Sequence, residues 1–208
     1  YTEWIKRIWN TWNQSKLKDF SDNWAEKAKK LGYRSRASFK LDQIENKYKI
    51  ISRSDLIFEL GSAPGGWSQI ISKHMKKESK CFSFDLLSMS EVKNISFFQK
   101  DITSSEFNSL AKDYFNEVDL VLSDMSVNLS GISIKDEEEN KELNYSTINL
   151  SKKLLKKQGN LLIKTFNNRN LPEIKSLFKG LFNKVIAEKP PASKTSSKEV
   201  YLLGLDLK

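Results

Sequence analysis

The 208-residue sequence has one cysteine and one histidine, and each scarcity excludes a class of protein. A single thiol, Cys81, cannot build a disulfide framework, and it fits a reducing compartment. It lies in the apolar stretch Cys-Phe-Ser-Phe, which indicates a small core residue. His74 stands among lysines on a predicted helix and is expected to be exposed. Because a metal site built on histidine and cysteine needs several such ligands, no metal is expected.

Long hydrophobic runs are also missing. No stretch reaches the length of a membrane span, so we expect no membrane partner. A hydrophobic content of 38% still suffices for a core, and 208 residues suit one domain. No repeat, second domain or long linker is evident, and we expect a monomer.

Positive charge is plentiful and uneven. The net charge is +9, and residues 1–50 contribute +6 of it, from twelve lysines and arginines against six acids. Such asymmetry suggests a polyanionic partner, although a solvated, lysine-rich surface accounts for it equally well. Within Tyr1–Asn13, three tryptophans and two isoleucines recur at helical spacing. That face either packs on the domain or stacks on bases.

The most informative pattern is the stretch Asp55–Trp67, DLIFELGSAPGGW. An apolar run predicts a buried strand, the small residues after it predict a tight turn, and an amphipathic helix begins at Trp67. These are the parts of a mononucleotide-binding unit. The turn lacks Gly-Lys-Ser/Thr, so it is no P-loop, and its glycine spacing is not that of the dinucleotide fingerprint.

Strands and helices alternate from the strand of this stretch onward, which predicts an α/β protein. An earlier helix is expected to end near Leu31, with a break at Gly32 and a second helix through residues 38–41. Residues 190–198 are expected to form a loop, and Pro172 suits the first turn of a helix. The predicted strands are 55–60, 80–85, 96–99, 118–123, 160–163 and 200–207, and the predicted helices are 67–76, 136–157 (closed by Gly159) and 171–182.

The segment LGSAPGGWSQ resembles the S-adenosylmethionine loop of the FtsJ/RrmJ family of ribose 2′-O-methyltransferases. The resemblance runs from about residue 20 to residue 207. It includes Arg34–Leu41, RSRASFKL, and the MSVNLSG that follows Asp124, where Val127 replaces the family's proline. It implies a Rossmann-like S-adenosylmethionine-dependent methyltransferase fold, with a mostly parallel twisted sheet, helices on both faces and an antiparallel C-terminal strand.

The same resemblance suggests one methyltransferase domain over residues 1–208. Residues 1–19 form an additional N-terminal amphipathic segment without a counterpart in the family. Residues 20–50 are a basic lead-in that faces RNA, and residues 51–208 form the catalytic core.

The family carries a Lys-Asp-Lys-Glu tetrad, and its members fall here on Lys40, Asp124, Lys164 and Glu199. A ribose 2′-hydroxyl must lose its proton as it attacks the sulfonium methyl group, and Lys164 is expected to take it. Burial and the positive charge of Lys40 and of the sulfonium favour a neutral lysine. The two acids oppose that effect, so orientation by hydrogen bonds is their expected role. A surface ion pair is the alternative reading of each residue.

The resemblance also assigns binding residues. Asp85 ends its strand where a carboxylate can accept hydrogen bonds from a ribose diol. Asp101 faces the adenine amino group in the family, although Lys100 stands where relatives often have glycine. The expected cofactor-binding residues are Gly61, Ser62, Pro64, Gly65, Gly66, Trp67, Asp85, Leu86, Asp101, Ile102 and Asp124, and the expected RNA-binding residues are Arg34, Arg36, Lys194 and Lys198.

The implied function is methylation of a ribose 2′-hydroxyl, at a uridine, in large-subunit ribosomal RNA within a large ribosomal particle. The Gly-Gly-Trp loop favours this branch, since the tRNA branch tends to have serine at the Gly66 position. A tRNA methyltransferase and a catalytically silent RNA-binding subunit stay open, and the complete tetrad argues against the second. Because the sequence starts at Tyr1 and not at methionine, we expect a trimmed leader and an organelle, the mitochondrion before the cytoplasm.

Overall fold

The computed structural model describes residues 23–127, 133–194 and 196–208. The tryptophan-rich helix predicted in residues 1–19 lies outside the described residues. In the described part of the chain, no helix is both long and apolar enough to cross a membrane.

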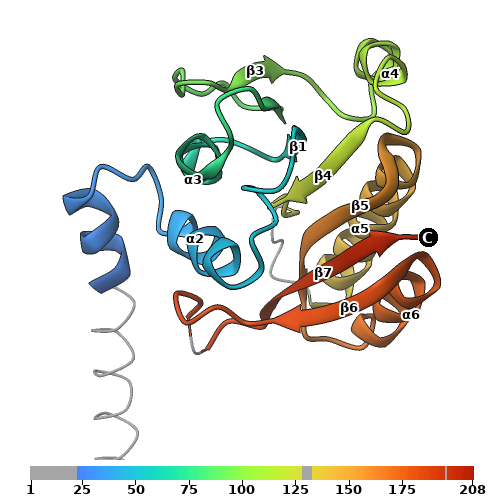
Figure 1. Ribbon diagram of the computed structural model, residues 1–208. Coiled ribbons are helices and arrows are strands. Elements are labelled where there is room, and N and C mark those ends of the chain that lie inside the picture. The colour runs from blue at the N-terminus through green and yellow to red at the C-terminus, as the bar shows by residue number, and fades with distance from the viewer. Residues whose placement is uncertain (1–22, 128–132, 195) are drawn as a thin grey trace, which may run out of the picture.

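Seven strands form one sheet in the order β3-β2-β1-β4-β5-β7-β6 (Figure 1). Neighbouring strands from β3 to β5 run parallel, while β7 runs antiparallel to both β5 and β6. The mostly parallel sheet with an antiparallel closing strand is therefore confirmed. The strands are β1 (Leu56–Leu60), β2 (Lys80–Asp85), β3 (Ser96–Gln99), β4 (Val118–Ser123), β5 (Leu155–Phe166), β6 (Phe182–Glu188) and β7 (Glu199–Leu207).

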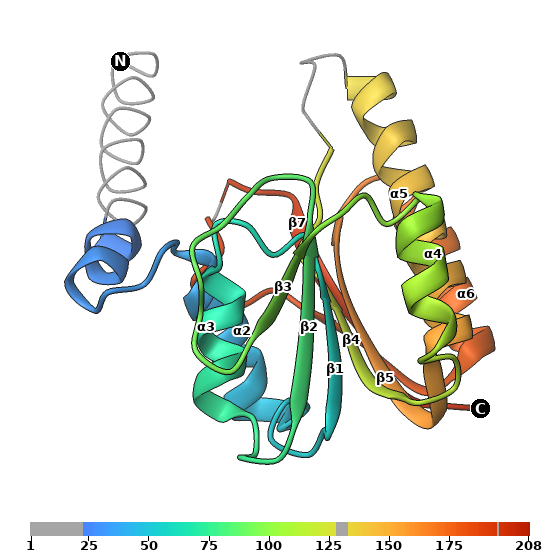
Figure 2. The ribbon, with the colours of Figure 1, turned by 90° about the horizontal axis from the view of Figure 1, so that it is seen from above.

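Helices cover both faces of the sheet, as predicted. Figure 2 shows α2 and α3 on one face and α4, α5 and α6 on the other. A helix over residues 23–30 precedes them, and a turn at Leu31 and Gly32 ends it. The labelled helices are α2 (Ala37–Tyr48), α3 (Gly66–His74), α4 (Ser105–Lys112), α5 (Ser133–Leu154) and α6 (Leu171–Leu181).

A hydrophobic core lies on each face because successive strand side chains point to opposite sides. Along β1, Ile57 enters the core under α2 and α3, and Phe58 enters the core under α4 to α6. Cys81 belongs to the first of these cores, as predicted, and burial raises the pKa of its thiol well above the ordinary value. The carboxyl ends of the parallel strands remain at one edge of the sheet, where ligands bind in open α/β folds.

The prediction was wrong at the end of α5. The helix ends at Leu154, three residues before Lys157, and β5 begins at once because Leu155 pairs with Val118 of β4. Gly159 therefore lies inside a strand, and the left-handed residue at this irregularity is Gln158, with a φ of 65°.

Three further features depart from the predictions. Helix α4 and strand β6 were not predicted. His74 is not simply exposed: its Nε2 lies 2.8 Å from Oδ1 of Asp42 on α2. This contact ties the end of α3 to α2.

Candidate active site

The glycine loop, residues 61–66, joins the carboxyl end of β1 to α3. Gly61 has a φ of +78° and Gly65 a φ of +104°, which a residue with a side chain rarely adopts. A Cβ atom on Gly61 would lie 2.6 Å from the Met125 Cγ and 2.9 Å from the Met125 backbone nitrogen. The loop is thus packed directly against the end of β4.

The first turn of α2 braces the loop from the other side. Ser38 Oγ donates to the Gly66 carbonyl at 2.9 Å, and Trp67 Nε1 donates to the Ala37 carbonyl at 3.0 Å. The Trp67 ring is 3% exposed and packs 5.7 Å from the Tyr201 ring, centroid to centroid. Trp67, predicted to bind cofactor, therefore has a side chain that joins α3 to the core.

The two predicted acids lie at neighbouring strand ends. Asp85 accepts hydrogen bonds from the Ala63 N–H at 2.9 Å and the Leu87 N–H at 2.8 Å, so it links β2 to the glycine loop. Asp101, two residues beyond β3, accepts from the backbone and the hydroxyl of Thr103. The backbone hydrogen bond, and then the hydroxyl, lower the pKa of Asp101.

These residues fit a nucleoside bearing a polar tail. The Ser62 hydroxyl in the loop is buried and has no hydrogen-bond partner among the described residues, which a ligand atom would supply. Leu86 is 65% exposed at the end of β2 and offers an apolar surface, and Ile102 is half-buried beyond β3. Among the described residues, no cluster of three His, Cys, Asp or Glu side chains could hold a metal ion.

The four tetrad residues meet as two ion pairs at this edge of the sheet. Lys40 Nζ lies 2.7 Å from Glu199 Oε2, although 159 positions separate them. Lys164 Nζ lies 3.1 Å from Asp124 Oδ1 and donates to the Asp124 carbonyl at 2.6 Å. Both lysines are buried, at 4% and 9% exposed. Burial alone would raise the pKa of Glu199, but the hydrogen bond and charge of Lys40, with the charge of Lys164, lower it.

Tyr201 joins the two ion pairs, although it was not among the residues predicted from the sequence. Its hydroxyl donates to Asp124 Oδ1 at 3.1 Å, and its ring lies 5.8 Å from Lys40 Nζ. Burial first, and the neighbouring acids next, raise its pKa well above the ordinary value. Tyr201 stands opposite Lys164 on β5 and two residues after Glu199. Residues two apart share one face of a strand, so the sequence Glu-Val-Tyr contained the signal.

Glu59 lies beneath the glycine loop and was also missed. It is fully buried on β1, where its Oε2 accepts from the hydroxyls of Ser68, at 2.6 Å, and Ser83. Its Oε1 has no partner among the described residues. Burial is the main reason that its pKa rises to about 7, and the charges of Asp124 and Asp85 add to the effect.

The four residues predicted to bind RNA separate into different environments. Lys194 and Lys198 are exposed in the loop before β7. Arg36 is close enough to Tyr201 for its charge to lower the pKa of that phenol. Arg34 differs from these, because its guanidinium donates to three carbonyl oxygens of the protein itself.

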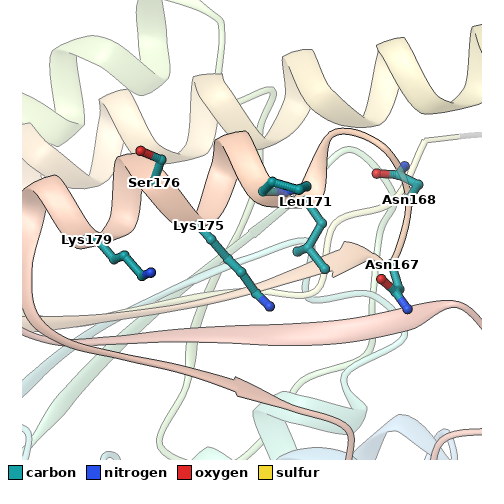
Figure 3. Close-up of a pocket in the computed structure, with 7 residues that line it drawn as sticks. Asn167, Asn168, Leu171, Lys175, Ser176 and Lys179 are labelled. Carbon is teal, nitrogen blue, oxygen red and sulfur yellow. The ribbon is translucent and has the colours of Figure 1, made fainter.

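A polar hollow lies along α6 (Figure 3). It begins next to the tetrad, since the Asn167 N–H donates to the Lys198 carbonyl at 2.7 Å, one residue before Glu199. In Figure 3, the Lys175 and Lys179 side chains extend from α6 toward the strands. The lining residues are Asn167, Asn168, Leu171, Pro172, Lys175, Ser176 and Lys179.

A parallel sheet with a glycine turn after β1, acids at the next two strand ends and a buried Lys-Asp-Lys-Glu set defines a methyltransferase of the Rossmann-like class. Comparison with known proteins makes the assignment specific. The chain belongs to the FtsJ-like methyltransferase family, whose model matches residues 33–207.

The curated relatives are similar over most of the chain. The ribosomal RNA large subunit methyltransferase E of Francisella tularensis subsp. novicida (strain U112) is 36% identical over 192 residues, 90% of this chain and 92% of the relative. That of Cellvibrio japonicus (strain Ueda107) is 37% identical over 187 residues, 89% of each. A crystal structure from Plasmodium falciparum, described as a ribosomal RNA methyltransferase, has a TM-score of 0.73 and 27% identity. It covers 84% of this chain and 98% of its own.

Proposed function

We propose that this methyltransferase transfers the methyl group of S-adenosylmethionine to a ribose 2′-hydroxyl of large-subunit ribosomal RNA. The observation that carries the proposal is the pair of buried ion pairs joined by Tyr201 beside the glycine loop. An arrangement with two desolvated lysines and two acids costs folding free energy, so it needs a functional reason. The names of the curated relatives support ribosomal RNA as the substrate.

The cofactor would lie along the ends of β1, β2 and β3. Residues 61–66 would hold its methionine part, Asp85 its ribose and Asp101 its adenine. When bound, S-adenosylmethionine supplies an electrophilic methyl group on a sulfonium. The buried Ser62 hydroxyl would find its hydrogen-bond partner there.

The tetrad residues would hold the hydroxyl and move its proton. Lys164 Nζ takes the 2′-hydroxyl proton, and only a neutral lysine can accept it. Asp124 orients the Lys164 amine, and Tyr201 holds Asp124 in place. Lys40 and Glu199, from α2 and β7, close the other side of the site. Alignment of the oxygen with the methyl group supplies most of the rate, and proton removal adds to it.

Basic residues around the site would bind the phosphates of the RNA backbone. Arg36, Lys194 and Lys198 were predicted to bind RNA, and the hollow along α6 adds Lys175 and Lys179. No ion pair of these two lysines is found within the described residues, whereas Glu173 on the same helix pairs with Lys141 of α5. Phosphate contacts set affinity and register but read no sequence, so target choice should depend on RNA shape.

The test is methyl transfer to large ribosomal particles, naked ribosomal RNA and tRNA at one salt concentration. The products are mapped for 2′-O-methylation, and Lys164→Ala is the inactive control. We expect the ribosomal particle to be the best substrate, and a uridine to be the target. Methylation of tRNA alone would support the tRNA alternative, and cofactor binding without transfer to any RNA would support a silent RNA-binding subunit.

Lys164→Arg separates proton transfer from charge. A guanidinium stays protonated in proteins, so this variant should bind S-adenosylmethionine and yet transfer no methyl group. Substantial transfer by Lys164→Arg would show that the positive charge matters and that Lys164 does not take the proton.

A further inference from the structure

Arg34 lies in a position that its predicted role in RNA binding does not explain. Its Nη1 donates to the Pro64 carbonyl at 3.2 Å and to the Ser90 carbonyl at 2.7 Å, and its Nη2 donates to the Glu91 carbonyl at 2.7 Å. Pro64 belongs to the glycine loop, while Ser90 and Glu91 belong to the segment that follows β2. One guanidinium therefore joins two segments that are far apart in the sequence.

The backbone of Arg34 is fixed as firmly as its side chain. Its N–H donates to Gln69 Oε1 at 2.8 Å, and the amide nitrogen of Gln69 donates back to the Gly32 carbonyl at 2.9 Å. Gln69 lies on α3, the helix that follows the glycine loop. These two hydrogen bonds therefore tie the Gly32–Arg34 turn to α3. A phosphate-binding side chain needs no such support.

Gly65 shows how closely the guanidinium approaches the loop. A Cβ atom on Gly65 would lie 2.5 Å from Arg34 Nη1 and 3.2 Å from Arg34 Cδ. The absence of a side chain at Gly65 thus permits the backbone φ of +104° and also leaves room for the Arg34 guanidinium. The loop and the arginine fit each other.

We propose that Arg34 is a positioning residue that holds the glycine loop and the segment after β2 at the separation that S-adenosylmethionine requires. The proposal rests on the proposed function, because it concerns that cofactor. The guanidinium is a planar fork with five donors and can bridge three carbonyls, whereas a lysine ammonium is a point charge that cannot span them. Two arginines that stand two residues apart then have separate tasks: Arg34 serves the cofactor loop, and Arg36 faces the catalytic edge.

The experiment compares Arg34→Ala and Arg34→Lys with Arg36→Ala as the matched control, all in the full chain. Titration calorimetry measures S-adenosylmethionine affinity, and hydrogen exchange without ligand measures opening of residues 60–66 and 86–92. We expect Arg34→Ala to lower cofactor affinity about tenfold or more and to speed exchange in both segments, because three charge-assisted hydrogen bonds are lost. Arg34→Lys should lie between Arg34→Ala and the wild type. Arg36→Ala should leave both measurements unchanged and weaken RNA binding with a smaller salt dependence.

Several outcomes would overturn this role. Unchanged exchange in both segments, with cofactor affinity within about twofold of the wild type, would show that Arg34 does not hold the loop. A smaller salt dependence of RNA binding in Arg34→Ala, with intact cofactor affinity, would return Arg34 to the phosphate-binding residues. If Arg34→Ala fails to fold, Arg34→Lys carries the test, because it keeps the aliphatic stem beside Gly65. A wild type without cofactor affinity would refute the proposed function, and the exchange data would still decide whether Arg34 braces the loop.

Discussion

Glu59→Gln should change how the stability of this protein depends on pH. Glu59 is fully buried, and its pKa rises from an ordinary 4.5 to about 7. The folded protein therefore binds more protons than the unfolded chain between these two values, so stability falls as pH rises through that window and is flat above it. The shift makes ionised Glu59 cost about 3 kcal/mol of stability in the folded state.

Glutamine has the same shape, keeps an oxygen for Ser68 and Ser83, and does not titrate. Urea unfolding followed by tryptophan fluorescence gives the unfolding free energies of both proteins. Between about pH 5 and pH 8, the wild type should lose roughly 2–3 kcal/mol of unfolding free energy relative to Glu59→Gln. A difference that stays constant over this range would refute the reasoning, because it would mean that Glu59 titrates alike in the folded and unfolded chains.

Glu45 provides a matched control. It is as deeply buried as Glu59, but its two oxygens accept backbone N–H groups of Ile51, at 2.7 Å, and Ser52, at 3.1 Å. Glu45→Gln replaces charge-assisted bonds and should cost about 1.5–3 kcal/mol at pH 8. At pH 8 the two substitutions should therefore change the free energy of unfolding in opposite directions: Glu45→Gln lowers it and Glu59→Gln raises it.

Two further predictions concern the loop and the tyrosine. Gly61→Ala should weaken S-adenosylmethionine binding in a titration, because the new Cβ would meet Met125. Gly180 lies in open space on α6, so Gly180→Ala should raise the free energy of unfolding in urea by up to about 1 kcal/mol. Unchanged cofactor affinity in Gly61→Ala would mean that the loop adjusts freely. Tyr201→Phe keeps the ring against Trp67 but removes the donor to Asp124, so the rate of methyl transfer should fall about tenfold at unchanged cofactor affinity. A full rate would make the hydroxyl dispensable.

The sequence predicted the strand ends well because local patterns determine them. The apolar runs of β1 and β4 and the glycine turn between β1 and α3 are each patterns of a few neighbouring residues. Asp85, the last residue of β2, and Asp124, directly after β4, stand next to such runs. Helix α4 had a readable signal as well, since Ser104 caps it by accepting from the Phe107 N–H. Pairings across the chain were not predictable in this way.

The contacts that sequence patterns could not reveal depend on the tertiary fold. Nothing local to Lys40 specifies Glu199 as its partner, because the pairing requires α2 and β7 to meet at one edge of the sheet. Strand β6 was missed because its seven residues follow α6 without a turn and show no clean alternation. Arg34 looked like one more cation in a basic segment, and only its three carbonyl partners reveal a different task.

The place of β7 in the sheet has a consequence for the order of events during synthesis. It lies between β5 and β6 although it follows both along the chain, and β7 is the only strand that pairs with β6 among the described residues. Until residues 199–207 have joined the sheet, β5 therefore exposes an open edge and β6 lacks the strand that pairs with it. Glu199 and Tyr201 arrive on the strand that fills this gap, so the catalytic set is completed at the same moment as the sheet. A nascent chain would then stay inactive until β7 is in place, and activity would itself report that this sheet is complete.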